Sequence, residues 1–405
     1  MAKNAQTKPI SGQQWRVLFA AQAGYMLDAM DVLLYVFALN TLRTEFHLTN
    51  AAAGSISSVT LVFSALGGIG AGILADRFGR KRLLVLSILL YSLASAGTAT
   101  AGGVYSLLFW RALVGLGLGG EWSAGAVLVA ETWPAVYRGR AIGFMQAGWA
   151  LGYLLAAGLA ALILPRFGWR MLFLAGVLPA LLAFAIRRGI AEPAVWRESR
   201  NAPRLSWISI FRPPLRRRTV LATSLTTSVL FAYWGLFTWL PGYLSAPRAA
   251  GGAGFSLVKT SGYLAPMQVG AFFGYVSFGF VSQRMGRRAA FLLYMLVSAA
   301  LAPAYGLARE SSTLLLLGPL VGFFGSGYFS LFGSFLAELY PTAIRGSAQG
   351  FTYNFGRGLS ALAPLFVGAL ADRNGIGTAL ALNSAFFLIA AALVFTLPGE
   401  SYLQE

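Results

Sequence analysis

The sequence predicts an all-α integral membrane protein with twelve transmembrane helices in two pseudo-symmetric six-helix bundles. Only 11% of its 405 residues are charged, whereas soluble globular proteins carry about 25%. Long runs without Asp, Glu, Lys or Arg recur along the chain, for example at 141–165 and 311–337. Two segments of the first half also recur in the second. These observations exclude a soluble enzyme, a disordered chain and a nucleic-acid-binding domain as leading interpretations.

The apolar runs place the helices in order along the chain. A bilayer core of about 30 Å requires about 20 apolar residues in a helix. We expect helices near residues 16–40, 50–75, 84–101, 105–131, 140–165, 168–187, 219–246, 258–282, 289–308, 312–338, 346–371 and 376–398.

The excess of positive charge orients this arrangement in the membrane. The net charge is +18, and 22 of the 31 Lys and Arg residues fall on the side that holds both predicted termini. Because positive charges concentrate in cytoplasmic loops, we expect both termini in the cytoplasm and the protein in the inner membrane. The positive charges are spread over short loops between the predicted helices. We therefore expect no nucleic-acid partner, and we expect the lipid bilayer to surround the protein.

One long polar segment divides the chain into two parts. Residues 187–218 contain nine Arg residues and read as a cytoplasmic linker. We therefore expect an N-terminal six-helix bundle at 1–186 and a C-terminal six-helix bundle at 219–405.

Two pairs of related segments show an internal duplication. GILADRFGRKR at Gly72 matches GFVSQRMGRR at Gly279, and ETWPAVYRGRAIGF at Glu131 matches ELYPTAIRGSAQGF at Glu338. Both pairs have the same offset of 207 in the numbering, which we call the repeat offset. A shared offset in two independent segments predicts duplicated halves. In transporters built from such repeats, the substrate site lies between the repeats near the midplane.

The loop between the second and third helices resembles that of the major facilitator superfamily. It carries the pattern G-x-x-x-D-R-x-G-R-[RK], and the fourth helix carries RALVGLGLGGEW, similar to the superfamily's Arg-then-glycine motif. The resemblance implies a twelve-helix fold, transport by alternating access and a latch on the cytoplasmic side. The expected gating residues are Asp76, Arg77, Arg80, Glu131, Arg138, Glu338 and Arg345.

Three further segments narrow the resemblance. The first helix contains the segment GYMLDAMDVLLYVFAL, which resembles the L-D-G-[FY]-D segment of the aromatic-acid and sialate proton symporters. GLGGEWSAGAVLVAETWP and GFTYNFGRGLSALAPLFVGAL resemble most closely the sialate/lactate:proton symporter group. The fifth helix lacks the glycine–proline pattern of antiporters, which favours a symporter.

Three acids inside the predicted spans are candidates for proton coupling. Asp28 and Asp31 lie one turn apart in the first helix and share a face, and Glu121 lies mid-span in the fourth. A carboxyl group at this depth is costly, so it is a functional candidate by default. The structural alternative is an ion pair with a basic residue such as Arg111. Depth does not distinguish Asp28 from Asp31.

Arg357 is the leading candidate for the substrate anchor. It lies near mid-bilayer in the eleventh helix, and its planar fork suits carboxylates. Tyr353 and Asn354 share its face and can add hydrogen bonds. The alternative is an ion pair with an acid of another helix. A further candidate is Arg111, which could instead form an ion pair that fixes the first and fourth helices. Softer candidates are Gln146, Gln268, Tyr233, Trp234 and Trp122, and the aromatic ones could instead pack or face lipid.

These residues predict a proton-coupled symporter of a small organic anion, a monocarboxylate such as lactate, a sugar acid or an aromatic acid. The alternatives are a proton-independent uniporter or anion exchanger and, in another class, a non-transporting membrane sensor on the same scaffold. There is no cysteine and a single histidine, His47, which we expect in a solvated loop. We therefore expect no enzymatic activity, no cofactor and no metal site, and partners limited to substrate, protons and lipid around a monomer.

Overall fold

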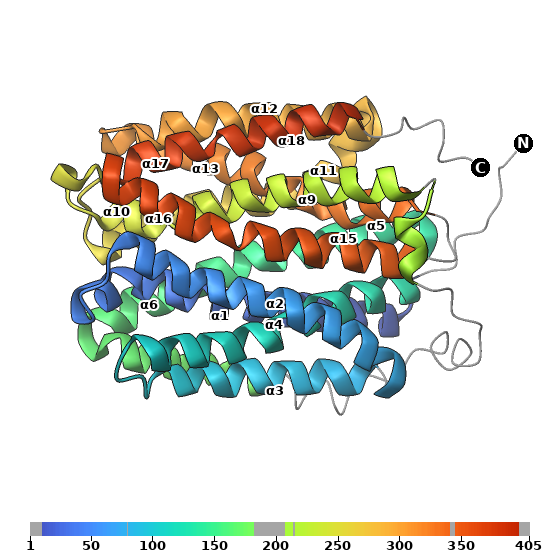
Figure 1. The fold of residues 1–405 in the computed structure, drawn as a ribbon, viewed down its shortest axis with the longest axis horizontal. Coiled ribbons are helices and arrows are strands. Elements are labelled where there is room, and N and C mark those ends of the chain that lie inside the picture. Colours follow the sequence, from blue (N-terminus) through green and yellow to red (C-terminus); the bar gives the residue numbers. More distant parts are fainter. Residues whose placement is uncertain (1–9, 79, 182–206, 214, 341–344, 397–405) are drawn as a thin grey trace, which may run out of the picture.

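A computed structural model describes residues 10–78, 80–181, 207–213, 215–340 and 345–396. Nearly all of these residues are helical, which confirms the all-α prediction. The helices run roughly along the long axis of the molecule, as Figure 1 shows. Helix α1 begins and helix α18 ends at the same end of this axis, which we call the terminal end. The opposite end, where α1 ends and α2 begins, is called the distal end.

The described residues of the first half contain six helices and one short 3-10 turn. The 3-10 turn η1 (Ala175–Val177) follows the sixth helix and continues into helical residues 178–181, and the next described residue is 207. The helices are α1 (Gly12–Glu45), α2 (Asn50–Phe78), α3 (Arg80–Thr98), α4 (Val104–Thr132), α5 (Ala135–Gln146) and α6 (Gly148–Leu174).

The second half begins with the 3-10 turn η2 (Trp207–Phe211) and includes a second turn, η3 (Arg248–Ala250). Its first helix, α9, starts at Leu215, slightly before the predicted start at 219. The helices are α9 (Leu215–Phe237), α10 (Leu240–Ser245), α11 (Leu257–Met285), α12 (Arg287–Gly306), α13 (Ser311–Gly327), α14 (Phe329–Glu338), α15 (Arg345–Ser360), α16 (Leu362–Asn374), α17 (Ile376–Asn383) and α18 (Ala385–Thr396).

Four pairs of consecutive helices each form one continuous rod: α5 with α6, α13 with α14, α15 with α16, and α17 with α18. The junction residues Ala147, Tyr328, Ala361 and Ser384 keep right-handed helical backbone angles, so only the hydrogen-bond ladder is interrupted there. A true break lies inside α6 at Gly168, where φ is 75°. Glycine adopts this conformation without steric cost, and Pro165 precedes it. The break falls at the boundary predicted between spans 140–165 and 168–187.

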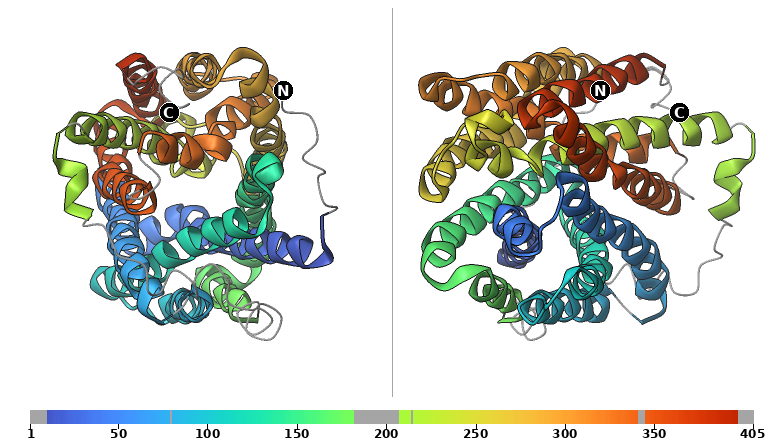
Figure 2. Two further views of the ribbon diagram at one scale, coloured as in Figure 1. Left: turned by 90° about the vertical axis from the view of Figure 1, so that its right-hand side faces the viewer. Right: turned by 60° about the vertical axis from the view of Figure 1, so that its left-hand side comes forward.

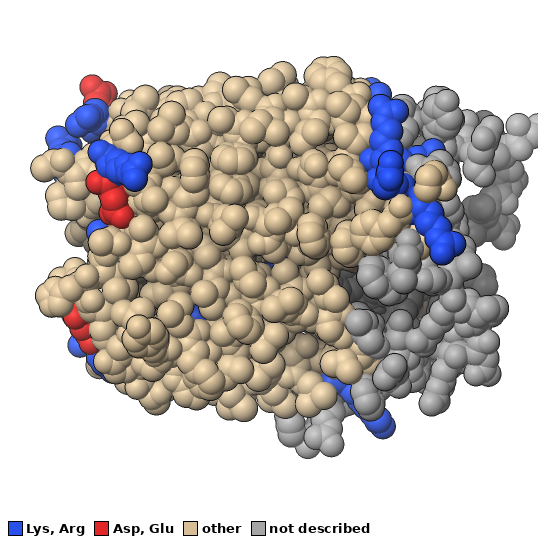
Figure 3. All heavy atoms as spheres, in the orientation of Figure 1, with Lys and Arg blue, Asp and Glu red and all other residues tan. Residues whose placement is uncertain are grey.

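Composition supports membrane insertion of this bundle. Among the described residues, seven helices are long and apolar enough to cross a bilayer, and the segments 82–98 and 311–327 are shorter apolar helices. On the face shown in Figure 3, charged side chains gather at the two ends, and the broad band between them is almost entirely uncharged. The count of twelve spans stays a prediction.

The duplication predicted from the sequence reappears in the helix packing. A Cβ atom on Gly115 of α4 would overlap the Thr60 carbonyl of α2, and one on Gly322 of α13 would overlap the Met267 carbonyl of α11. Both residues of the second contact follow those of the first at the repeat offset. Gly67 against Leu116 is repeated in the same way by Gly274 against Phe323. Small residues allow such close approach of membrane helices, so the α2–α4 and α11–α13 pairs are equivalent parts of the two halves.

The two halves lie against each other along their length. The blue-to-green half and the yellow-to-red half form separate groups in Figures 1 and 2. Helix α2 packs against α15 and α16 on one flank, and α5 and α6 pack against α11 and α14 on the other. The exact domain boundaries at 186 and 219 stay a prediction, because most of the 187–218 linker lies outside the described residues.

Candidate functional site

Among the described residues, five charged side chains are buried in the helical core, with at most 6% of their surface exposed. All five were predicted as candidates. Two helices of the first half and one of the second contribute them: Asp28 and Asp31 on α1, Arg111 and Glu121 on α4, and Arg357 on α15.

Arg111 and Asp31 belong to a group formed within the first half. The Arg111 Nε donates a hydrogen bond to the Thr60 Oγ1 at 3.3 Å, and its guanidinium lies 5.4 Å from the centre of the Tyr35 ring. Asp31 is the acid that attracts Arg111 most directly. The Asp31 carboxylate also lies beside the Ser95 hydroxyl of α3. This group connects α1, α2, α3 and α4.

Arg357 of the second half and Asp28 of the first lie within electrostatic range of each other. The Arg357 Nη1 donates a hydrogen bond of 3.0 Å to the Ser64 Oγ of α2, and the guanidinium lies 5.7 Å from the Tyr353 ring centre. Asp28 lies within electrostatic range of Arg357 and of Glu121. The two neighbouring aspartates therefore differ in the arginine that lies within their electrostatic range: Arg111 of the same half for Asp31, and Arg357 of the other half for Asp28.

The acids of this site are not neutralised by ion pairs. Among the described residues, no salt bridge joins any of the five buried charges, and the carboxylate oxygens of Asp31 and of Glu121 accept no hydrogen bond of good geometry, although Ser95 and Tyr91 lie beside them. Tyr91 of α3 is fully buried and lies within electrostatic range of all three acids. An ionised carboxylate is costly in such a site unless a cation or a proton compensates it.

Aromatic side chains from both halves surround the charged pair. Trp149 of α6 packs against Tyr25 of α1, with ring centres 5.2 Å apart, and edge-to-face against Trp234 of α9 at 5.8 Å. Tyr233 stacks on Phe237 at 4.5 Å. Tyr25 lies within electrostatic range of both Asp28 and Arg357. The aromatic cluster of Tyr25, Trp149, Tyr233 and Trp234 is therefore continuous with the charged site.

The predicted amide candidates lie at the interface between the halves. The Gln146 Nε2 donates to the Phe329 carbonyl of the other half at 3.3 Å. Asn354 donates to the Gly350 carbonyl at 2.9 Å and lies so close to Gly68 of α2 that a Cβ there would overlap its side chain. Gln268 is buried on α11, and its Nε2 has no hydrogen-bond partner among the described residues.

Other predicted residues fall elsewhere. His47 is exposed in the loop after α1, as expected. The side chain of Trp122 lies outside the described residues. The same holds for the seven gating candidates: Asp76, Arg77, Arg80, Glu131, Arg138, Glu338 and Arg345.

Sequence reasoning missed several residues of the site. Thr60, Ser64, Tyr91, Tyr25 and Trp149 carry no charge, and each lies in an apolar run where hydroxyl and aromatic side chains are common. Ser64 and Thr60 lie one turn apart on α2. This spacing, which places two hydroxyl groups on one face of the helix, was the only sequence feature that could have indicated them. Their arginine partners belong to other helices and could not be deduced from spacing.

Comparison with known proteins decides the family. The Major Facilitator Superfamily profile matches residues 23–277 and 254–403. A protein of Cupriavidus pinatubonensis, named for transport of 4-methylmuconolactone, is 36% identical over 98% of this chain and 91% of its own. The chain belongs to the major facilitator superfamily.

Two more distant relatives agree with this assignment. A sialic acid transporter of Escherichia coli is 27% identical over 98% of this chain and 97% of its own. The structure of a bacterial homologue of the human lysosomal transporter Spinster, in an inward-facing and unoccupied conformation, aligns with a TM-score of 0.74 at 19% identity. That alignment covers 96% of this chain and 97% of that one. This major facilitator protein is a multi-pass membrane transporter and not an enzyme.

Proposed function

We propose that this chain is a proton-coupled symporter that imports a small organic anion, a monocarboxylate, by alternating access of its two halves. The observation that supports this proposal is that the buried Arg357 and Asp28, on opposite halves, lie within electrostatic range of each other without a salt bridge among the described residues. A buried guanidinium can bind a carboxylate with two parallel hydrogen bonds. An isolated ionisable pair inside a membrane marks a substrate or proton pathway by default.

Coupling follows from one cation facing two carboxylates. In the empty protein, ionised Asp28 compensates the charge of Arg357. A substrate carboxylate that binds Arg357 displaces Asp28, and the displaced charge is costly in a dry site, the more so beside Glu121. A proton on Asp28 removes this cost. Substrate and proton therefore bind together, and Tyr353 and Asn354 add hydrogen bonds to the substrate.

The aromatic cluster favours a flat substrate. Ligand pockets combine aromatic walls with a few polar groups that fix orientation, and aromatic rings pack well against other π-systems. The relative named for 4-methylmuconolactone handles a flat unsaturated ring. The sialic acid transporter handles a sugar acid instead. We therefore place aromatic and unsaturated monocarboxylates before lactate and sugar acids as substrates.

The remaining roles complete the proposal. Asp31 and Arg111 hold the first half together around the site, and Glu121 tunes the cost of charge on Asp28. Gln146, Gln268 and Tyr233 line the substrate path, and the seven gating residues close the cytoplasmic side. The protein is a monomer in the inner membrane with both termini in the cytoplasm, and residues 1–186 and 219–405 move as units.

Uptake into proteoliposomes tests this proposal. The purified protein is given benzoate, nicotinate, lactate or N-acetylneuraminate, with and without an inward proton gradient. We expect gradient-driven accumulation, strongest for the flat acids. Uptake that is the same with and without the gradient would indicate a uniporter or an exchanger, and exchange would appear as uptake that depends on an internal anion. Absence of uptake and exchange for every acid would overturn the anion assignment and favour a sensor.

A further inference from the structure

One hydrogen-bonded contact at the distal end joins the two halves through a carboxylate. Asp372 lies at the end of α16, and α2 begins at Asn50. The Asp372 Oδ1 accepts hydrogen bonds from the Asn50 backbone N–H at 3.0 Å and from its side-chain Nδ2 at 2.7 Å. The Asp372 Oδ2 accepts from the Ala51 N–H at 2.9 Å. We call this contact the Asp372 cap.

The donors of this contact are the N–H groups that a helix cannot satisfy itself. The first four N–H groups of a helix have no partner within it. In α2, Thr49 satisfies the third and fourth through its Oγ1 and its carbonyl. The first two depend on Asp372. A carboxylate there also interacts favourably with the helix dipole, and Arg43 of α1 lies within electrostatic range of it.

Close packing brings Asp372 to this position. A Cβ atom on Gly54 would overlap the Pro364 backbone, and one on Gly368 would contact the Asn50 backbone. Helices α2 and α16 are therefore in backbone contact over the distal turns. A second bond between the halves lies nearby, where the Asn40 Nδ2 of α1 donates to the Ser245 Oγ of α10 at 2.7 Å.

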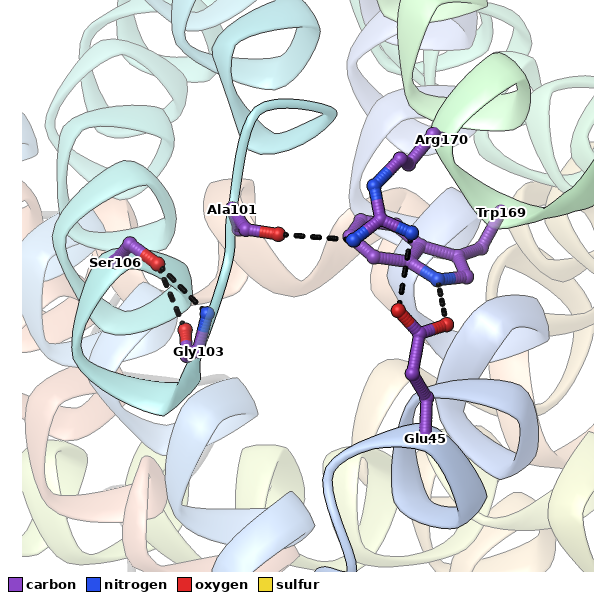
Figure 4. A network of polar contacts seen from close by, with 6 residues as sticks. All are labelled: Glu45, Ala101, Gly103, Ser106, Trp169 and Arg170. Atoms are coloured by element: carbon purple, nitrogen blue, oxygen red, sulfur yellow. Dashed lines mark hydrogen bonds and ion pairs between the residues drawn. The ribbon is translucent and has the colours of Figure 1, made fainter.

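The equivalent helix of the other half has a local cap like that of Thr49, but among the described residues no carboxylate reaches its start. Helix α11 begins at the repeat offset from α2, and the Ser256 Oγ directly before it accepts from the Lys259 N–H at 3.3 Å. Both partners lie in the same half. The network of Glu45, Trp169, Arg170 and Ala101, drawn in Figure 4, likewise stays inside the first half: Arg170 donates to Glu45 at 3.0 Å and to the Ala101 carbonyl at 3.3 Å.

We infer that the Asp372 cap is a latch that stabilises the conformation in which the distal end is closed. Opening this end moves α16 away from α2, so water must replace the carboxylate at two backbone N–H groups and one amide. The cap is thus formed in one conformation and lost in the other, whereas the Ser256 cap persists in both. This inference rests on the proposed alternating access, but its test requires neither substrate nor proton gradient.

Distance measurement between the halves tests the latch. The chain contains no cysteine, so two spin labels can be attached at Gly102→Cys and Ala249→Cys without removing native thiols. Both positions are exposed in distal loops, one in each half, and a Cβ on Gly102 meets no neighbouring atom. Electron–electron double resonance in nanodiscs then measures the populations with the distal end closed and open.

The expected result is a shift towards longer distances in Asp372→Asn and Asp372→Ala. Loss of about one or two kcal/mol corresponds to an open-to-closed ratio raised about five- to thirty-fold. Asn50→Ala removes one of the three hydrogen bonds of the Asp372 cap, so it raises the open-to-closed ratio less. Glu310→Gln removes an exposed carboxylate before α13, and Ser256→Ala removes the local cap, so both keep the wild-type distribution. The inference is overturned if Asp372→Asn and Asp372→Ala also keep the wild-type distance distribution, or if Glu310→Gln shifts that distribution as much as they do.

Discussion

Among the described residues, the first half buries three carboxyl groups and Arg111, whereas the second half buries one charge, Arg357. Both halves nevertheless use the same glycine contacts between equivalent helices, repeated at the same offset as the sequence motifs. The duplicated scaffold therefore does not specify the chemistry. In the proposed mechanism, the first half carries the proton-binding groups and the second half anchors the substrate. The variants below break or sharpen this comparison.

The largest effect is expected for Arg357. Arg357→Lys keeps the charge but loses the planar fork, so substrate uptake should fall about ten- to a hundredfold, because a lost bond to a charged group costs about 1.5–3 kcal/mol. The measurement is the initial rate of uptake into proteoliposomes across substrate concentrations. Arg111→Lys is the matched control in the other half, and it should lower thermal stability more than substrate affinity. Normal uptake by the Arg357→Lys protein would contradict the proposal that Arg357 anchors the substrate carboxylate.

The two aspartates should respond differently. Asp28→Asn should retain exchange of substrate across the membrane but lose accumulation driven by the proton gradient, because residue 28 no longer titrates. Asp31→Asn removes the carboxylate that lies within electrostatic range of Arg111, and a buried charge left without compensation is costly. It should therefore lower the melting temperature most. Fluorescence-detected unfolding and paired uptake and exchange assays separate these effects, and identical behaviour of the two variants would contradict the assignment.

The repeated glycine contacts should be equally sensitive in both halves. Gly115→Ala and Gly322→Ala each drive a Cβ into a backbone carbonyl of the neighbouring helix, and overpacking costs about 1–3 kcal/mol. Both should lower the melting temperature by similar amounts. Gly158→Ala is the control, because a Cβ there meets open space and the residue is exposed on α6. A loss confined to one half would show that the halves are not packed equivalently.

The smallest effect is expected at the start of α11. Ser256→Ala removes a local helix cap, which typically costs about 1 kcal/mol. The melting temperature should fall slightly, with uptake unchanged. If uptake falls more than stability, Ser256 takes part in the transport cycle and the contrast with the Asp372 cap disappears.

Much of the fold could be predicted because helix length and apolar runs are local properties. The predicted spans 140–165 and 168–187 meet at Gly168, where the structure has its break. The interruptions of the hydrogen-bond ladder at Ala147 and Tyr328 could not be predicted, since the backbone angles there remain helical. The start of α9 at Leu215 differs because the basic residues 216–218 continue the helix.

The site was only partly predictable, because partners across helices depend on the packing. Charge inside an apolar run identified all five buried ionisable residues. Depth could not separate Asp28 from Asp31, and only the packing of α4 and α15 assigned each its arginine. Trp149 gave no signal, since tryptophan is common in membrane helices. Asp372 resembled an ordinary charged residue at a helix end until α2 was placed beside it.

The edge-to-face contact of Trp149 and Trp234 has an optical consequence. One indole belongs to α6 and the other to α9, so the pair connects the two halves next to the proposed binding site. Indoles this close couple their electronic transitions and produce a paired circular-dichroism band in the ultraviolet. The proposed rocking of the halves would change the spacing and angle of the rings. Unlabelled protein therefore carries an intrinsic spectroscopic reporter of that proposed motion.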